Sequence, residues 1–155
     1  MELANATNLE IWANLQTARD QLPQLVRKLI SSTGQGLVKL SMPAGEGVGK
    51  HGWDGVVEAI QEDVHVPKGK SCWEMGVNKD PQAKANKDFA TRRKNPGAGV
   101  DPANTVFIFV TPRRWAEKDD WAQRRKDEKL WEDVVVYDAD DLETWLERAP
   151  AVHVW

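Results

Sequence analysis

Asp54 and Glu74 are the two residues on which a chemical function for this sequence depends. They stand in two short stretches, 52–58 and 71–77, that roughly alternate small or polar residues with bulky apolar ones. This alternation is typical of strands that have one face in a core and the other toward a cleft. If the strands form an antiparallel hairpin centred near Val64, Asp54 and Glu74 lie directly opposite each other, with β-carbons roughly 5 Å apart.

Two carboxylates at such a distance repel each other unless one is protonated or a cation lies between them. A divalent cation bound through oxygen atoms, Mg²⁺ or Mn²⁺, meets this need. Lys79 follows the second carboxylate, in a loop that leads to a basic helix. A metal ion with two carboxylates and a lysine suits the hydrolysis of phosphodiester bonds. We therefore predict Asp54 and Glu74 as metal ligands and, together with Lys79, as catalytic residues.

The stretch from Lys79 to Lys94 is basic in a chain whose net charge is −3. It holds six basic and two acidic residues, a local charge of +4. Asp80 and Pro81 have the form of an N-cap and a first helical residue, so we expect a helix to about residue 94. The outward face of such a helix can rest on a phosphate backbone. We predict four nucleic-acid-binding residues, three on this helix and one in the preceding glycine-rich loop: Lys50, Lys84, Lys87 and Arg92.

Length and composition favour a single domain. The chain has 155 residues, of which 41% are hydrophobic and 29% are charged. It has neither a bilayer-spanning apolar run nor a signal peptide, so we expect a cytoplasmic location and no membrane partner. The single cysteine, Cys72, excludes an internal disulfide and a cysteine-based zinc site, and its place in a strand suggests packing. We expect most of the eight tryptophans to anchor the core or an interface.

The N-terminal part of the sequence predicts helices followed by a strand. Thr7 and Glu10 have the spacing of a capping box, with Thr7 as the N-cap of a helix. Glu10 is then either only the partner of this cap or an additional acid that helps the metal site. Pro23 interrupts the apolar pattern that follows, so we expect a kinked helix or two consecutive helices that end at Gly34. Residues 37–42 alternate like a half-buried strand.

The C-terminal half predicts an alternation of strands and helices. Residues 105–111 form a continuous apolar run, the pattern of a strand buried on both faces and central in its sheet. A mostly exposed helix over 118–132, a strand over 134–137 and a helix capped from Asp138 follow. The full order, helix, strand, strand, strand, helix, strand, helix, strand, helix, predicts an α/β fold with a mixed central sheet flanked by helices. The apolar end, 151–155, suggests the N-terminal domain of a longer protein.

This order, with an aspartate on the second strand and Trp-Glu on the third, resembles the PD-(D/E)xK nuclease superfamily, the restriction-endonuclease-like fold, and more loosely its Mrr-like branch. The resemblance covers most of the chain and implies an αβββαβ core and a single nuclease-like domain over residues 1–155. Asp54 matches the first acidic residue of the family motif and Glu74 the second, and both are metal ligands in the family. Gly76 stands where the family has its lysine, and Lys79 is placed to bring its ammonium to the same point, as migrated lysines do in some members.

The resemblance implies metal-dependent hydrolysis of DNA, with Mg²⁺ or Mn²⁺ held by Asp54, Glu74 and the Met75 carbonyl. Contacts to the backbone carry no sequence preference, so cleavage would be non-specific or directed by other domains. Similar domains occur as N-terminal effectors of large bacterial antiviral NTPases. This analogy implies a role in anti-phage defence, other domains in the full-length chain, and activation in a homo-oligomer.

One alternative stays open, a module that keeps the fold without the chemistry and binds nucleic acid or protein, which Gly76 and the acidic net charge favour. A doubly wound nucleotide-binding or TIR-like domain would need a helical crossover between the two acidic strands, and residues 61–70 are too few for it. The glycine-rich stretch 44–52 lacks the spacing of a phosphate-binding P-loop. The three histidines have no serine or cysteine partner in a recognisable nucleophile elbow.

Overall fold

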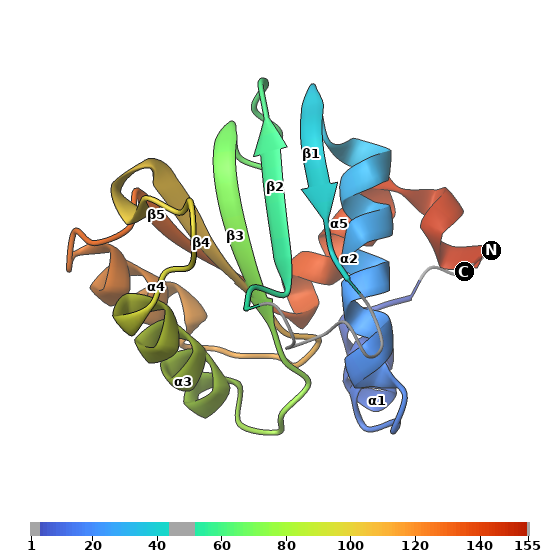
Figure 1. Cartoon of the computed structure of the whole chain (residues 1–155). Coiled ribbons are helices and arrows are strands. Elements are labelled where there is room, and N and C mark those ends of the chain that lie inside the picture. The colour runs from blue at the N-terminus through green and yellow to red at the C-terminus, as the bar shows by residue number, and fades with distance from the viewer. Residues whose placement is uncertain (1–3, 44–51, 155) are drawn as a thin grey trace.

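The computed structural model describes residues 4–43 and 52–154, so Lys50 and most of the glycine-rich loop lie outside the described residues. The described chain forms one five-stranded sheet with helices against both faces (Figure 1). The strands stand in the sheet in chain order: β1 (Leu37–Ser41), β2 (Gly55–Ala59), β3 (Gly69–Met75), β4 (Thr105–Val110) and β5 (Asp133–Tyr137). The first three strands pair antiparallel and the last three parallel. The predicted class, α/β with a mixed sheet flanked by helices, is confirmed.

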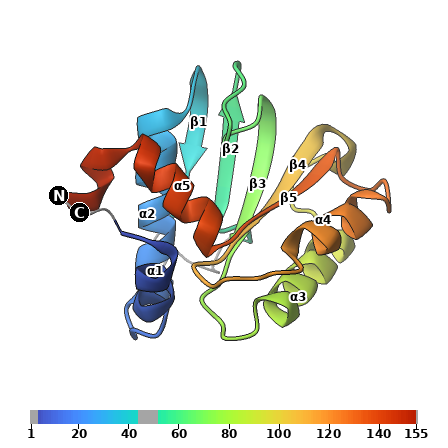
Figure 2. The same cartoon turned by 180° about the vertical axis from the view of Figure 1, so that it is seen from behind.

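In the described part of the chain, five α-helices cover the two faces of the sheet: α1 (Ala6–Ala13), α2 (Ala18–Thr33), α3 (Pro81–Lys94), α4 (Lys118–Lys126) and α5 (Ala139–Arg148). The views from the front and from behind place α1, α2 and α5 on one face and α3 and α4 on the other (Figures 1 and 2). Short 3-10 turns at Pro102–Asn104 and Pro150–Val154 complete the described chain. Within these residues, no helix has the length and apolar character needed to cross a membrane.

Each face of the sheet has its own hydrophobic core. The core under α1, α2 and α5 is largely aliphatic around Trp73 and Trp145, whereas the core under α3 and α4 is aromatic around Phe107 and Trp121. Cys72 is fully buried in the second core, and this burial raises the pKa of its thiol to about 11. The prediction that Cys72 serves packing is therefore confirmed.

The hairpin of β2 and β3 has the register that the sequence predicts. Gly55 pairs with Trp73 and Ala59 with Gly69, an arrangement symmetrical about Val64. One step beyond this ladder, the same register sets Asp54 opposite Glu74. The two carboxylates therefore reach the same end of the sheet because of the length of the connection between the strands.

The first helix begins two residues earlier than predicted, and Thr7 is not its cap. Asn5 is the N-cap of α1: its side chain accepts a hydrogen bond from the Asn8 amide at 2.8 Å, and its own amide donates to the Asn8 side chain at 3.0 Å. Asparagine is at least as favourable as threonine at an N-cap, so the pair Asn5 and Asn8 can cap the helix in place of the predicted Thr7 and Glu10. Glu10 is not a cap partner and instead pairs with Arg114, whose Nη1 lies 3.3 Å from its Oε1.

Two consecutive helices form at the N-terminus, which is one of the two arrangements expected from the sequence. Pro23, however, does not separate them. The break falls between Ala13 and Ala18, and Pro23 lies buried inside α2. Its ring removes only the amide that would bond the carbonyl of Arg19, near the start of the helix. The apolar face of α2, which packs on the core, offsets the loss of this hydrogen bond.

Three further expectations about the elements need correction. β1 has an irregular register between Leu37 and Lys39, which leaves Val38 66% exposed where the alternation predicted a buried side chain. β4 is buried throughout, but the middle strand of the sheet is β3. The helix expected over 118–132 ends at Lys126; Lys129 has a φ of 57°, in the left-handed region that a right-handed helix does not contain, and Trp131 packs in the aromatic core from beyond this turn.

Candidate functional site

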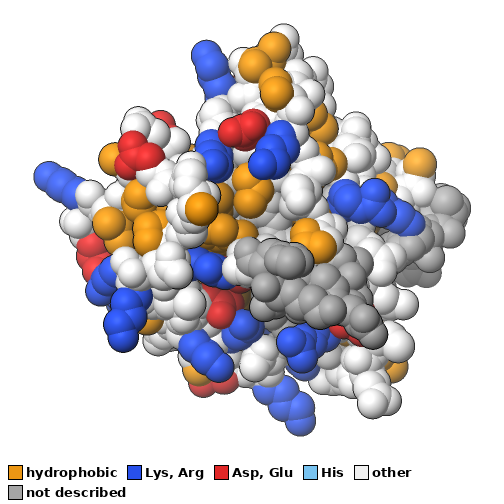
Figure 3. Space-filling view, in the orientation of Figure 1, with side chains coloured by type: hydrophobic (Ala, Val, Ile, Leu, Met, Phe, Trp, Pro, Cys, Tyr) orange, Lys and Arg blue, Asp and Glu red, His pale blue; other side chains and the backbone are white. Residues whose placement is uncertain are grey.

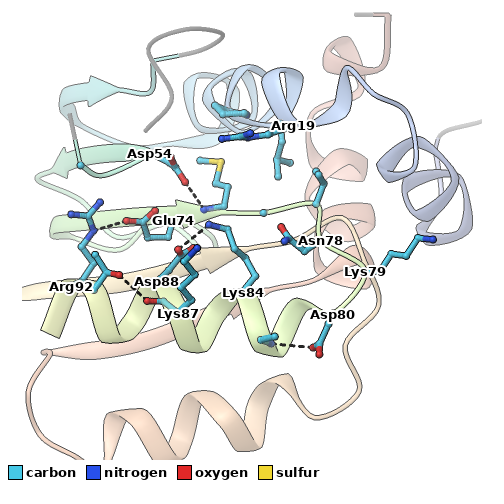
Figure 4. Close-up of a pocket in the computed structure, with 18 residues that line it drawn as sticks. Arg19, Asp54, Glu74, Asn78, Lys79, Asp80, Lys84, Lys87, Asp88 and Arg92 are labelled. Carbon is cyan, nitrogen blue, oxygen red and sulfur yellow. Dashed lines mark hydrogen bonds and ion pairs between the residues drawn. The ribbon is translucent and has the colours of Figure 1, made fainter. Parts of the chain in front are cut away.

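A cavity of about 1010 Å³ lies at the C-terminal end of β3, between α2 and α3 (Figure 4). Asp54, Glu74 and Gly76 line it from the sheet, and the cavity extends along the loop that leads from β3 into α3. Figure 3 shows Lys and Arg side chains around a few acidic ones on the lower part of this face of the molecule. The site is therefore an acidic floor between two helical layers, surrounded by positive charge.

The two predicted carboxylates come together at this floor. Asp54 is 7% exposed and Glu74 is 5% exposed, and both line the cavity. Asp54 is held in place because its Oδ2 accepts a hydrogen bond from the Met75 amide at 2.9 Å. Met75 also lines the cavity.

Arg92 lies inside the cavity rather than on the outward face of α3. Its Nε donates to Oε1 of Glu74 at 2.6 Å, and its side chain is only 12% exposed. The guanidinium stacks over the ring of Trp53, 4.6 Å from the centroid, and the Trp53 indole in turn donates to the carbonyl of Pro96 at 2.7 Å. Arg92 therefore does not lie on the outward face of the helix, where the sequence led us to expect it; its role in binding nucleic acid stays a prediction.

Lys84 also turns inward, and it occupies the space left by the missing side chain of Gly76. A β-carbon built at position 76 would lie 2.7 Å from Cγ of Lys84 and 3.0 Å from its Cε. The Lys84 ammonium donates to Oδ1 of Asp88 at 2.9 Å, within the same cavity. The lysine that stands near the acidic floor is thus Lys84, which comes from α3 and not from β3.

Lys79 borders the cavity but points away from Asp54 and Glu74 (Figure 4). Lys87 also lines the cavity. Neither of these lysines forms an ion pair with any described residue. Glu10, on α1 and paired with Arg114, is not among the described residues that line the cavity. The structure therefore does not bring Lys79 or Glu10 to the carboxylates.

Two residues of the site escaped the sequence analysis. Arg19, near the start of α2, lines the cavity on the side opposite α3 and forms no ion pair with a described residue (Figure 4). Asp88 lies on α3, one helical turn from both Lys84 and Arg92, and is only 9% exposed. The spacing of 84, 88 and 92 was a readable signal, because residues four apart share one helical face. Nothing local in the sequence marked Arg19.

The carboxylates of the cavity are buried beside one another, and this changes their acidity. Burial first, and then the charge of Asp54, raise the pKa of Glu74 to about 9, although Arg92 acts in the opposite direction. Burial also raises the pKa of Asp88, against the opposing effect of Lys84. A raised pKa means that these buried carboxyl groups resist ionisation, so a cation bound beside them would favour their charged forms.

The donor set of the cavity suits a hard divalent cation such as Mg²⁺ or Mn²⁺, because it consists of carboxylate oxygens. Oδ2 of Asp88 is buried and has no hydrogen-bond partner among the described residues, so it is free to accept a further ligand. As the side chains stand, no three His, Cys, Asp or Glu residues within 4–43 and 52–154 form a group that could hold a metal ion. A metal ion at Glu74 would have to displace Arg92.

Comparisons of the chain with protein-family models, with curated proteins and with solved structures found no match. A function for this protein therefore has to be argued from the cavity and its residues.

Proposed function

We propose that this domain hydrolyses phosphodiester bonds in DNA with Mg²⁺ or Mn²⁺ bound at Asp54 and Glu74. The observation that carries the proposal is a pair of buried carboxylates that line one cavity, with the charge of Asp54 acting on Glu74 and basic side chains around both. Burial and mutual repulsion both destabilise the ionised carboxylates, and a bound cation would offset this destabilisation. Cations farther out, above all Arg19 and Lys87, supply charge for a phosphate backbone.

The resemblance to PD-(D/E)xK nucleases, given above on the strand order and the two acids, supports the same reaction. We assign the role of the family lysine to Lys84 rather than to Lys79. Lys84 fills the space over Gly76 and directs its ammonium into the cavity, whereas Lys79 points outward. In this proposal α3 supplies the lysine that the family carries at the strand position matched by Gly76.

The proposal assigns a separate role to each of Asp54, Glu74 and Lys84. A cation held by Asp54 and Glu74 would lower the pKa of a bound water and neutralise charge on the scissile phosphate. Asp54, fixed by the Met75 amide, keeps its carboxylate oriented. Lys84 stabilises the negative charge that develops on the phosphate oxygens. Because the remaining contacts are to backbone phosphates, we propose cleavage that is non-specific or directed by other domains.

We also propose a biological setting, which rests on the family resemblance alone. The domain would act in the cytoplasm as an effector in bacterial anti-phage defence, with DNA as its substrate. Further domains of a longer chain would direct it, and assembly into a homo-oligomer would activate it. These statements are analogies from related architectures and not consequences of the cavity.

Nicking of supercoiled plasmid tests the activity. The domain is incubated with Mg²⁺ or Mn²⁺, and separately with EDTA, beside Asp54→Asn and Glu74→Gln variants whose folding is checked by circular dichroism. Asp80→Asn is the matched control, since Asp80 borders the same cavity but is exposed, and asparagine still caps α3. We expect metal-dependent nicking by the parent and the control only. Nicking that survives in the Asp54→Asn variant would contradict the proposal.

A second candidate function is a nuclease-fold module that binds nucleic acid or protein without cleaving it. The observation in its favour is the buried ion pair between Arg92 and Glu74, which gives Glu74 a cation from the protein itself. Direct measurement of Mn²⁺ binding separates the two candidates. An inactive module would bind Mn²⁺ no better with Asp54 present than with asparagine in its place.

A further inference from the structure

Among the described residues that line the cavity, Asp88 is the one with a buried side-chain oxygen that lacks a hydrogen-bond partner. Its Oδ1 accepts the hydrogen bond from Lys84 at 2.9 Å, but its Oδ2 is buried and finds no hydrogen-bond partner within residues 4–43 and 52–154. Buried carboxylate oxygens almost always have a donor or a cation beside them. Asp88 is 9% exposed and lines the cavity, so this oxygen is placed where a bound cation could contact it.

The three acids of the cavity act as one electrostatic group. The charge of Asp54 acts on both Glu74 and Asp88, and the charge of Asp88 acts on Glu74. Figure 4 shows Asp88 reaching from α3 toward the same space as Glu74 on β3. Against these three carboxylates stand two contacting cations, Lys84 and Arg92, so the group carries one negative charge in excess when all are ionised.

We propose that Asp88 is a third oxygen ligand of the divalent cation, so that the residue before β2, the strand β3 and the helix α3 each supply one carboxylate. This inference rests on the proposed function, because it adds a ligand to the metal site of Asp54 and Glu74. Binding exchanges cations: Asp88 turns from Lys84, Glu74 releases Arg92, and the metal ion takes the place of both. The exchange also frees the Lys84 ammonium for a phosphate oxygen.

Direct measurement of Mn²⁺ binding tests this assignment without reference to activity. Free Mn²⁺ is followed by electron paramagnetic resonance during titration of the parent domain, of Asp88→Asn and of the exposed control Asp80→Asn. Asparagine keeps the size of residue 88 and one oxygen but removes its charge. We expect the dissociation constant for Mn²⁺ to rise at least tenfold in Asp88→Asn and to stay unchanged in Asp80→Asn. Urea unfolding in EDTA confirms that each variant is folded.

A Lys84→Met variant separates a ligand from a residue that acts only through Lys84. If Asp88 served only to position Lys84, both variants would change Mn²⁺ binding in the same direction. As a ligand, Asp88 loses a competitor when Lys84 is removed, so Mn²⁺ binding becomes tighter in Lys84→Met and weaker in Asp88→Asn. Parent-like binding by Asp88→Asn, with binding lost in Asp54→Asn, would overturn this inference and leave the proposed function standing. Absence of Mn²⁺ binding by the parent would overturn both.

Discussion

Lys84 lies directly over Gly76, so close that a β-carbon at position 76 would stand 2.7 Å from its Cγ. The two positions share one space, and only one of them can carry a side chain without a shift of the neighbour. A lysine from α3 thereby enters a cavity whose floor is formed by residues of β3 and the start of β2. This relationship makes the source of the positive charge testable.

If a lysine in this space is needed for nicking, a lysine at position 76 should partly replace the one at position 84. Lys84→Ala is expected to slow plasmid nicking by about 100-fold, the usual effect of removing one group that stabilises developing charge. Adding Gly76→Lys to this variant should restore part of the rate, because alanine at 84 leaves the space free. Lys94→Ala, at the exposed end of the same helix, is the control. Nicking at the parent rate by Lys84→Ala would exclude the assigned role.

Arg92 competes with a metal ion for Glu74, so its removal should strengthen metal binding. In Arg92→Gln the dissociation constant for Mn²⁺ is expected to fall about tenfold. In EDTA the same variant should melt at a lower temperature than the parent, since it loses the buried ion pair and the stacking on Trp53. Mn²⁺ should recover the lost stability. Calorimetric titration and thermal unfolding test both effects, and weaker Mn²⁺ binding by the variant would show that Arg92 does not compete.

The raised pKa of Glu74 predicts how stability depends on pH in the absence of metal. Burial and the charge of Asp54 raise the pKa of Glu74 to about 9 in the folded domain, whereas in the unfolded chain the ordinary value is 4.5. Between these limits the folded state binds more protons, so the free energy of unfolding falls as pH rises, by at most about 1.4 kcal/mol per pH unit. This contribution is fully present below pH 4.5 and lost above pH 9.

Glu74→Gln removes this proton, and glutamine can still accept the hydrogen bond from Arg92. In EDTA, the free energy of unfolding of this variant should therefore fall less between pH 5 and pH 9 than that of the parent. At pH 9 the variant should be more stable than the parent. Urea titrations at pH 5, 7 and 9 measure the difference. Parallel curves for the two proteins would mean that Glu74 is already ionised at neutral pH.

Arg19 should bind phosphate although it is remote in sequence from the acidic residues. Arg19→Ala is expected to weaken binding of an oligonucleotide in EDTA and to reduce the salt dependence of binding by about one phosphate contact. Arg27→Ala is the matched control, because Arg27 is exposed on the same helix and is not among the described residues that line the cavity. Fluorescence anisotropy at several salt concentrations gives both quantities. Equal effects of the two substitutions would remove Arg19 from the binding surface.

The sequence predicted the features that depend on local spacing. The short connection between β2 and β3, residues 60–68, gives a hairpin centred on Val64, which sets Asp54 opposite Glu74. The pair Asp80-Pro81 marks the start of α3, where the Asp80 side chain accepts a hydrogen bond from the Ala83 amide at 3.0 Å. Alternation and apolar runs gave the order of the strands, because these patterns follow directly from burial on a sheet.

The features that depend on packing between distant elements could not be predicted in the same way. Lys84, Asp88 and Arg92 form a charged stripe on α3, and such a stripe usually faces solvent. Here it faces the acids instead, because the cavity between the two helical layers opens on this side of α3. Arg19 joins the site only through the packing of α2 on the sheet. Val38 is exposed because an irregular register interrupts β1, which no alternation of residue types reveals.

The central claim is that a metal ion at Asp54 and Glu74 cleaves DNA, and the most direct test measures metal occupancy and nicking on the same samples. Mn²⁺ bound to the domain is quantified by electron paramagnetic resonance while the rate of plasmid nicking is followed across the titration. The account predicts that the rate rises in proportion to occupancy in the parent, and that Asp54→Asn loses both. A parent that binds Mn²⁺ at this site and leaves the plasmid intact, or a nicking rate independent of occupancy, would contradict it.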